Sequence, residues 1–171
     1  MNTLLRSVYV LIVLFISPWL QAAKLGESLP ALQFDTQPFN FAFAPNGKHQ
    51  LITVLLPSIE SQKNGKFNKK VTQAGFCPLA IVDMQRRAWY APQKTVEQEI
   101  EKEIDAAKAS SSAKLGCRVS IDYDRRVQKA WDLGEGNTTI VVDPDGKIVF
   151  ITEGVLDAEQ EQAVLKLLAS D

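Results

Sequence analysis

The sequence predicts an α/β fold in which a mixed β-sheet lies between two covering layers. Apolar, β-branched runs alternate with helical patterns through most of the chain, and two strand patterns near the carboxyl terminus are joined by a tight turn. Alternating strands and helices give parallel strands with right-handed crossovers, whereas strands joined by a tight turn are antiparallel. We therefore expect a three-layer α/β/α sandwich that closes with an antiparallel hairpin and a final helix.

The first 22 residues have the three parts of a secretory signal peptide: a positively charged start, an apolar centre and small residues at the end. The apolar centre, residues 8–20, is short for a spanning helix, which needs about 20 apolar residues, and it contains Pro18. We expect cleavage after Ala22 or Ala23. The sequence therefore predicts a signal peptide at 1–22, a periplasmic location and no stable membrane anchor after cleavage.

Residues 23–171 predict a single domain with a small excess of acidic residues. The whole chain has 19 basic and 20 acidic residues, and the signal peptide takes one basic residue with it. A nucleic-acid-binding surface is usually basic, so we expect no nucleic-acid partner. The chain has one histidine, His49, and its two cysteines match no zinc or haem spacing, so we expect neither a metal nor a cofactor.

The domain is expected to begin with a leader and a central strand. Residues 24–47 are punctuated by proline and glycine, and Asn46-Gly47 is a turn signal, so we expect a short strand or hairpin that packs on the domain. Residues 49–56 are apolar and rich in β-branched side chains, which is typical of a buried strand. Pro57 ends this strand.

A polar helix is expected from Ser58 toward Gln73. Ser58 can cap its amino terminus, and Phe67 and Val71, four residues apart, give it an inner face. The other face is basic and is interpreted as solvated, with an acidic partner as the alternative. Its lysines are at positions 63, 66, 69 and 70.

Two further strands flank the clearest predicted helix. Residues 78–84 predict a second buried strand and residues 118–121 a short one. Between them a helix is expected to open at Thr95 and to end by Gly116. Acidic residues crowd its first turns, and apolar residues recur four apart at positions 96, 100 and 104.

A short helix follows the strand at 118–121. Asp124 is expected to cap it, with Val127, Ala130 and Trp131 turned toward the core. Asp122 and Asp124 are explained by caps and turns rather than by a metal site.

A hairpin and a last helix complete the predicted domain. Strands at 138–142 and 147–152 are joined by residues 143–146 (DPDG), which are typical of a tight turn. This turn explains Asp143 and Asp145 without a metal. The last helix begins at a capping box and has an apolar face; the residues are Asp157 and Gln160, and Ala163, Val164, Leu167 and Leu168.

Cys77 and Cys117 each stand just before a predicted strand. If the strands at 78–84 and 118–121 are parallel neighbours, the cysteines lie side by side, since neighbouring strands are about 4.8 Å apart and bridged Cα atoms are similarly close. In an oxidising compartment a structural disulfide is the simplest outcome. A relocated redox pair is the first alternative, although reactive thiols usually stand at a helix amino terminus. Two unpaired buried cysteines are the second.

Two segments carry a resemblance to a known family. Residues 115–133 (LGCRVSIDYDRRVQKAWDL) resemble the peroxiredoxin-like segment in which a short strand ends in Asp and a small helix follows. Residues 136–150 (GNTTIVVDPDGKIVF), with the following Gly154-Val155-Leu156, resemble the closing hairpin of the thioredoxin superfamily. With its signal peptide, the chain is similar to the YtfJ-like family of small bacterial periplasmic proteins. That resemblance implies a thioredoxin-like fold and no settled activity.

The sequence departs from thioredoxins at both halves of their redox site. Thioredoxins carry Cys-x-x-Cys where the first buried strand meets its helix, whereas this junction reads Ser58-Ile59-Glu60-Ser61. Serine cannot carry out thiol exchange. The cis-proline that faces the thiols falls, by the resemblance, at or next to Thr138. Ser58, Ser61 and Thr138 are therefore interpreted as degenerate active-site positions.

These observations predict an exported binding or accessory protein rather than an enzyme. Thioredoxin-like proteins bind extended chains near the three degenerate positions, so a protein or peptide partner is expected there. A serine nucleophile with His49 or Lys63 as its base is disfavoured, because helix capping explains the serines. The alternative function is a thiol-disulfide or peroxide-reducing oxidoreductase that uses Cys77 and Cys117.

Overall fold

The computed structural model describes residues 23–34, 41–56, 59–84, 94–95, 98, 117 and 119–170. The expected signal peptide and almost all of the helix expected at 95–116 lie outside these residues. None of the described helices is long and apolar enough to cross a membrane. In chain order, the elements are β1 (Leu32–Phe34), β2 (Phe41–Phe43), β3 (Gln50–Leu55), α1 (Ile59–Gln73), β4 (Leu79–Asp83), β5 (Val119–Asp122), α5 (Arg126–Trp131), β6 (Thr138–Val142), β7 (Ile148–Glu153) and α6 (Ala158–Leu168).

Five of the strands form one mixed sheet in the order β5-β4-β3-β6-β7. β4 is parallel to both β3 and β5, whereas β6 is antiparallel to both β3 and β7. The parallel pairs follow from the alternation of strand and helical patterns, since a crossover returns the chain to the same edge of the sheet. The mixed sheet with a carboxyl-terminal antiparallel hairpin is thus confirmed.

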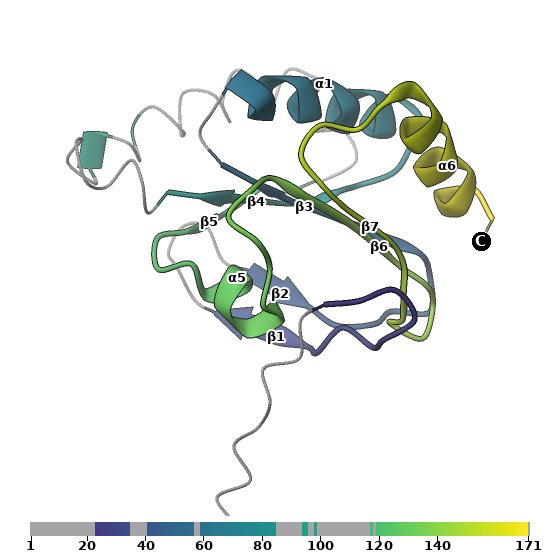
Figure 1. Cartoon of the computed structure of the whole chain (residues 1–171), viewed down its shortest axis with the longest axis horizontal. Helices are drawn as coiled ribbons and strands as arrows, with labels where there is room; N and C mark the ends of the chain where they lie inside the picture. Colours follow the sequence, from purple (N-terminus) through teal and green to yellow (C-terminus); the bar gives the residue numbers. More distant parts are fainter. Residues whose placement is uncertain are drawn as a thin grey trace, which may run out of the picture.

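Other elements cover both faces of this sheet. Figure 1 shows α1 and α6 on one face, and α5 together with the small β1-β2 sheet on the other. Each face has its own apolar core because successive strand residues point to opposite faces. Leu51 of β3 packs with Phe67 and Val71 of α1, which confirms the predicted inner face of that helix, whereas the next residue, Ile52, packs on the α5 side. The described residues therefore form three layers.

Trp131, the last residue of α5, holds the leader against the domain. Its ring lies edge-on to those of Phe41 and Phe43, with centroids 5.9 and 5.5 Å away. Its indole N–H donates a 3.0 Å hydrogen bond to the carbonyl oxygen of Pro30. The N–H of Ala23 donates a 3.0 Å hydrogen bond to the carbonyl oxygen of Trp131. The first described residues are therefore part of the folded unit.

The leader contains a hairpin, but its turn is not the one expected. β1 and β2 are antiparallel, with Phe34 opposite Phe41, so their connection lies between those two residues. Asn46 and Gly47 link β2 to β3 instead. The N–H of Lys48 donates a 3.1 Å hydrogen bond to Asn46 Oδ1, and Gly47 has a φ of 77°. The turn signal is real, but the expectation that it closes the leader hairpin is wrong.

The carboxyl-terminal hairpin forms around the expected turn. The N–H groups of Asp145 and Lys147 donate hydrogen bonds of 3.0 and 2.8 Å to Asp143 Oδ1. Gly146 has a φ of 82°, in the left-handed region that glycine adopts most readily. These contacts align β6 with β7.

α6 begins at the expected capping box. The N–H of Gln160 donates to Asp157 Oδ1 at 2.8 Å, and the N–H of Asp157 donates to Gln160 Oε1 at 3.0 Å. Val164 and Leu168 are buried on the inner face of α6, as expected. Ala163, which was also expected there, is exposed.

Candidate functional site

The carboxyl ends of the parallel strands β3, β4 and β5 lie at one edge of the sheet, which we call the carboxyl edge. Because Thr138 pairs with Val54, β6 begins at this edge, and α1 begins there too because it follows β3. Ligand sites of open α/β sheets lie outside the carboxyl ends of the strands. The carboxyl edge is therefore the first place to look for a functional site.

Asp83 and Asp122 end β4 and β5 and lie side by side in register. Both are buried, and adjacent buried carboxylates must each be compensated. Asp122 is compensated by the backbone. The N–H groups of Val127 and Asp124 donate hydrogen bonds of 2.8 and 3.2 Å to its two carboxylate oxygens. Asp122 thus caps the first turn of α5.

The expectation that Asp124 caps α5 is wrong. The residue at the cap position is Arg125, whose backbone is left-handed with a φ of 55° and whose side chain makes no capping hydrogen bond. This local turn brings Asp122, rather than Asp124, to the amino end of the helix. Val127 and Trp131 are buried as expected, but Ala130 is exposed and Gln128 is buried in its place.

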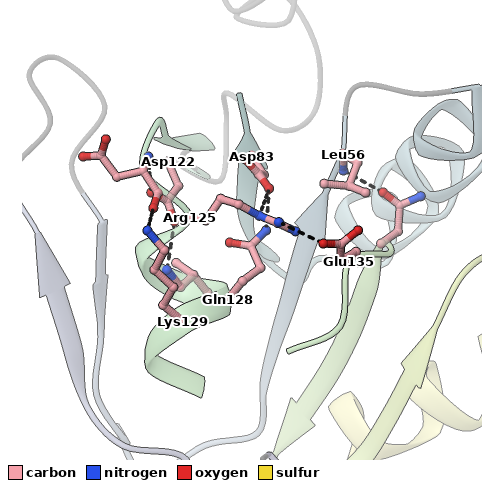
Figure 2. Close-up of polar contacts among 10 residues, drawn as sticks. Leu56, Asp83, Asp122, Arg125, Gln128, Lys129 and Glu135 are labelled. Atoms are coloured by element: carbon pink, nitrogen blue, oxygen red, sulfur yellow. Dashed lines mark hydrogen bonds and ion pairs between the residues drawn. The ribbon is translucent and has the colours of Figure 1, made fainter. Parts of the chain in front are cut away.

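Asp83 is compensated by an ion pair. Arg125 Nε lies 3.1 Å from Asp83 Oδ2, and Gln128 Nε2 donates a 2.9 Å hydrogen bond to the same oxygen. Figure 2 shows the Arg125 guanidinium reaching from Asp83 toward Glu135, whose Oε1 lies 3.6 Å from Arg125 Nη1. The side chain of Arg125 is 19% exposed and that of Glu135 75% exposed. The Arg125 side chain is therefore anchored to a buried carboxylate and remains partly exposed.

Several buried side-chain polar atoms of the described residues have no hydrogen-bond partner. Gln128 Oε1 and Thr138 Oγ1 are two of those at this edge. Thr138 and Asp83 lie on the same face of the sheet as the core residues Ile140 and Ile81, two positions along their strands. Buried polar atoms are normally hydrogen-bonded, so such exceptions indicate an ordered water or a ligand.

Asn137 ties the end of β3 to the start of β6. Its Oδ1 accepts a 2.7 Å hydrogen bond from the N–H of Leu56, and its carbonyl oxygen accepts a 2.8 Å bond from the N–H of Gly154. Asn137 is buried. Asn137 therefore fixes the ends of β3 and β7, the two strands that flank the start of β6.

The structure describes only some of the predicted site residues. Thr138 lies at the carboxyl edge, where α1 begins. Ser58 and the side chain of Ser61 lie outside the described residues. His49 directly precedes β3 and therefore lies at the opposite end of that strand, away from the start of α1. This position does not support His49 as a base at the start of α1. Lys63 is exposed on α1.

Cys77 and Cys117 form a disulfide at the other end of the sheet, which we call the amino edge. Their Cα atoms are 5.2 Å apart. Each cysteine stands two residues before β4 or β5, and these strands are parallel neighbours. The disulfide expected from that arrangement is thus present. An open hollow of about 600 Å³ lies beside it, and its lining includes Cys77, His49 and Lys48.

Among the described residues, no group of His, Cys, Asp and Glu side chains could hold a metal ion. The aspartates that could suggest one have other contacts. Asp122 caps α5, Asp143 organises the hairpin turn, and Asp124 Oδ2 lies 3.1 Å from Arg126 Nη2.

The residues of the ion pair carry little signal in the sequence. Asp83 and Asp122 end apolar strand patterns, and polar residues at such positions are a cue for a carboxyl-edge site. Arg125 and Gln128 are residue types that usually lie on the solvated face of a helix. Their contacts depend on the left-handed backbone of Arg125, which no residue type in the segment predicts.

Comparison with known proteins bears on both family and fold. A family model described as "Bacterial protein of unknown function (YtfJ_HI0045)" matches residues 83–171. No curated protein matches the chain.

Solved structures of thiol-disulfide proteins are similar to most of the chain. A thiol-disulfide isomerase from Corynebacterium glutamicum has a TM-score of 0.60 at 16% identity, covering 83% of this chain and 97% of its own. The thioredoxin domain of a thiol-disulfide oxidoreductase from Bacteroides vulgatus has a TM-score of 0.57 at 18% identity, covering 85% and 98%. A peroxiredoxin-like protein from Aquifex aeolicus has a TM-score of 0.54 at 14% identity, covering 86% and 89%. The expected thioredoxin-like fold is thus confirmed.

Proposed function

The chain belongs to the YtfJ_HI0045 family of bacterial proteins of unknown function, and from this premise we propose that it is a periplasmic, thioredoxin-like protein that binds an extended peptide or protein segment at its carboxyl edge. In this proposal the protein carries out no thiol chemistry at that edge. The family match agrees with the resemblance drawn from the sequence. The proposed location rests on the signal-peptide pattern of residues 1–22.

The position of the disulfide is the observation that carries this proposal. The chain has only two cysteines, and both are joined to each other at the amino edge. Redox thiols of this fold need the start of the helix after the first central strand, where free N–H groups lower the thiol pKa. That helix is α1, and it begins at the carboxyl edge. The carboxyl edge therefore has no thiol with which to exchange a disulfide.

The carboxyl edge nevertheless has the features of a binding surface. An arginine with a buried anchor is accessible there, and Gln128 Oε1 and Thr138 Oγ1 are buried without partners among the described residues. Convergent polar groups on a rigid frame are typical of recognition sites. These features support binding, whereas the fold alone would not.

A second candidate function is a thiol-disulfide or peroxide-reducing oxidoreductase that uses Cys77 and Cys117. One observation favours it: Cys77 is exposed and lines the open hollow at the amino edge, so a partner thiol could reach its sulfur. Against it, both cysteines precede strands in the described part of the chain, whereas reactive thiols usually stand at a helix amino terminus.

Thiol counting separates the two functions. The binding proposal expects no free thiol in the native protein, a disulfide that resists mild dithiols, and no reduction of insulin or peroxide. A disulfide that cycles at a potential between about −120 and −270 mV would instead favour the oxidoreductase. The Cys77→Ser/Cys117→Ser double variant should keep its binding function under the first proposal and lose its activity under the second.

Site-specific photo-crosslinking in the periplasm tests binding directly. A photoreactive amino acid at Glu135, which is exposed at the carboxyl edge, should capture a defined partner. The matched control is Asp145, which is exposed in the β6–β7 turn at the far end of the sheet. Capture at both positions, or at neither, would contradict the proposed site.

A further inference from the structure

We propose that the carboxyl edge recognises a carboxylate group of its peptide ligand through Arg125, and that Glu135 occupies this position until the ligand displaces it. The inference rests on the proposed function and adds the chemistry of the ligand. The carboxylate can come from an acidic side chain or from a free chain end.

Arg125 is held from the inside of the protein. Its Nε is paired with Asp83, which is only 1% exposed, and Gln128 donates to the same carboxylate oxygen. A guanidinium fixed at one nitrogen keeps its remaining N–H groups in a rigid fork. The direction in which Arg125 presents those groups is therefore set before any ligand arrives.

The backbone of Arg125 supports a functional role for its side chain. A φ of 55° is uncommon for a residue other than glycine, asparagine or aspartate. Such strained residues cluster at ligand sites. Glycine at position 125 would relieve the strain, but it would leave the buried Asp83 without its cation. The position thus needs the arginine side chain in spite of the backbone conformation.

The contact of Glu135 with Arg125 is loose. Its Oε1 lies 3.6 Å from Arg125 Nη1, farther than a direct hydrogen bond, and its side chain is 75% exposed. Ion pairs of such exposed side chains contribute little to stability. A ligand carboxylate can approach more closely and form the bidentate pair that guanidinium groups favour. The contact with Glu135 shows that an anion is accepted at this position.

Among the described residues, the charges around Arg125 favour a carboxylate over a dianion such as phosphate. Asp83 is paired with Arg125 from within, and Asp124 lies nearby in the sequence and is paired with Arg126. A ligand with a single negative charge replaces Glu135 without changing the local charge. A second negative charge would be repelled by the buried carboxylate of Asp83.

Arg126 provides a matched control. It is the next residue, and its side chain is 39% exposed. It pairs with Asp124, and its guanidinium lies over the ring of Phe34, 4.8 Å from the centroid. Arg126 therefore has the same charge one position along the chain, but among the described residues the ion pairs of Asp83 and Glu135 are with Arg125.

Three peptides test the inference: Ac-Ala-Val-Glu-Val-Ala-NH₂, the same peptide with Gln for Glu, and Ac-Ala-Val-Gln-Val-Ala with a free carboxyl terminus. Binding is followed by the NMR signal of the Arg125 side-chain Nε–Hε group and by titration calorimetry. We expect at least one of the two carboxylate peptides to bind about tenfold more tightly than the neutral peptide, which corresponds to one charge-assisted contact. Which of them binds identifies the source of the carboxylate.

Three variants sharpen the result. Glu135→Gln, on the exposed surface, should increase affinity for the carboxylate peptide severalfold because it removes the internal competitor. Arg126→Gln should leave all affinities unchanged. Arg125→Lys keeps a cation beside Asp83 but removes the fork, and it should abolish the preference for a carboxylate.

Each outcome bears on the inference. Equal binding of the three peptides would overturn carboxylate recognition and leave peptide binding in place. The absence of any binding would also overturn it, and the crosslinking experiment would then decide the proposed function separately. If Arg126→Gln lost the preference for a carboxylate and Arg125→Lys kept it, the carboxylate would bind to Arg126, and the inference would be overturned.

Discussion

The backbone N–H of Leu56 and the side-chain oxygen of Asn137 are joined by a 2.7 Å hydrogen bond across 81 positions of sequence. Leu56 directly follows β3, and Asn137 directly precedes β6. The bond therefore holds the end of β3 against the start of β6. The two segments that frame the carboxyl edge are thus connected by one buried amide.

Asn137→Ala should destabilise the protein. The substitution leaves the N–H of Leu56 without its acceptor, and an unsatisfied buried donor costs about 1–3 kcal/mol. Urea denaturation measures the loss as a lower midpoint at an unchanged slope. Asn46→Ala, which removes an exposed bond to the N–H of Lys48, should cost less than about 0.5 kcal/mol. Equal losses would contradict the structural role of Asn137.

The disulfide should contribute strongly to stability and not to the shape of the carboxyl edge. Its cysteines are 40 positions apart, and closing a loop of that length stabilises a chain by about 4 kcal/mol in the chain-entropy model. The Cys77→Ser/Cys117→Ser variant should lose about this free energy of unfolding and keep the Arg125 Nε–Hε signal in place. Reduction of the wild-type protein should give a similar loss. A shifted Arg125 signal would show that the two edges are coupled.

Two glycines should respond to alanine in opposite directions. At Gly146, a Cβ would clash with Cγ of Pro45, and φ is 82°, so Gly146→Ala should cost about 1–2 kcal/mol. At Gly65, within α1, a Cβ would meet nothing within 4 Å, so Gly65→Ala should gain about 1 kcal/mol from helix propensity alone. Thermal melts of the two variants give the comparison directly, and a stabilising Gly146→Ala would refute the described turn.

Removing the buried partner of Arg125 should be far more costly than removing an exposed one. Asp83→Ala should cost about 3 kcal/mol, the lower end for a broken buried pair, because Arg125 retains some contact with water. The exposed pair of Lys70 and Glu161 is the control, and Lys70→Ala should cost less than about 1 kcal/mol. Chemical denaturation of both variants measures the difference. Similar losses would mean that the Asp83 pair has no special role.

The mixed sheet and its closing hairpin could be predicted because long-range packing and local chemistry agree there. The runs that include Leu51 and Ile81 are apolar enough to read as buried strands, and Asp143 to Gly146 form a turn by residue type alone. The disulfide followed from strand adjacency rather than from the cysteines themselves. Each of these features depends on strand or turn patterns that can be recognised within a short segment of sequence.

The candidate site could be predicted only in outline. The location of Thr138 at the carboxyl edge followed from the resemblance, but the ion pair of Asp83 and Arg125 did not. That pair depends on one left-handed residue, which moves the cap of α5 from Asp124 to Asp122. Arginine is rare in this conformation, so sequence patterns give no reason to expect it. A local exception of this kind is more common at functional sites than elsewhere.

The N–H of Ala23 donates a hydrogen bond to the carbonyl oxygen of Trp131, at the boundary of the proposed signal peptide. If the signal peptidase cuts after Ala22, the nitrogen of Ala23 becomes a charged ammonium at the carboxyl end of α5, where the helix dipole favours a positive charge. A cut after Ala23 would instead remove this donor from the mature protein. We therefore expect the amino-terminal sequence of the processed protein to begin at Ala23. In that case the cleavage itself would create the last electrostatic contact of the mature form.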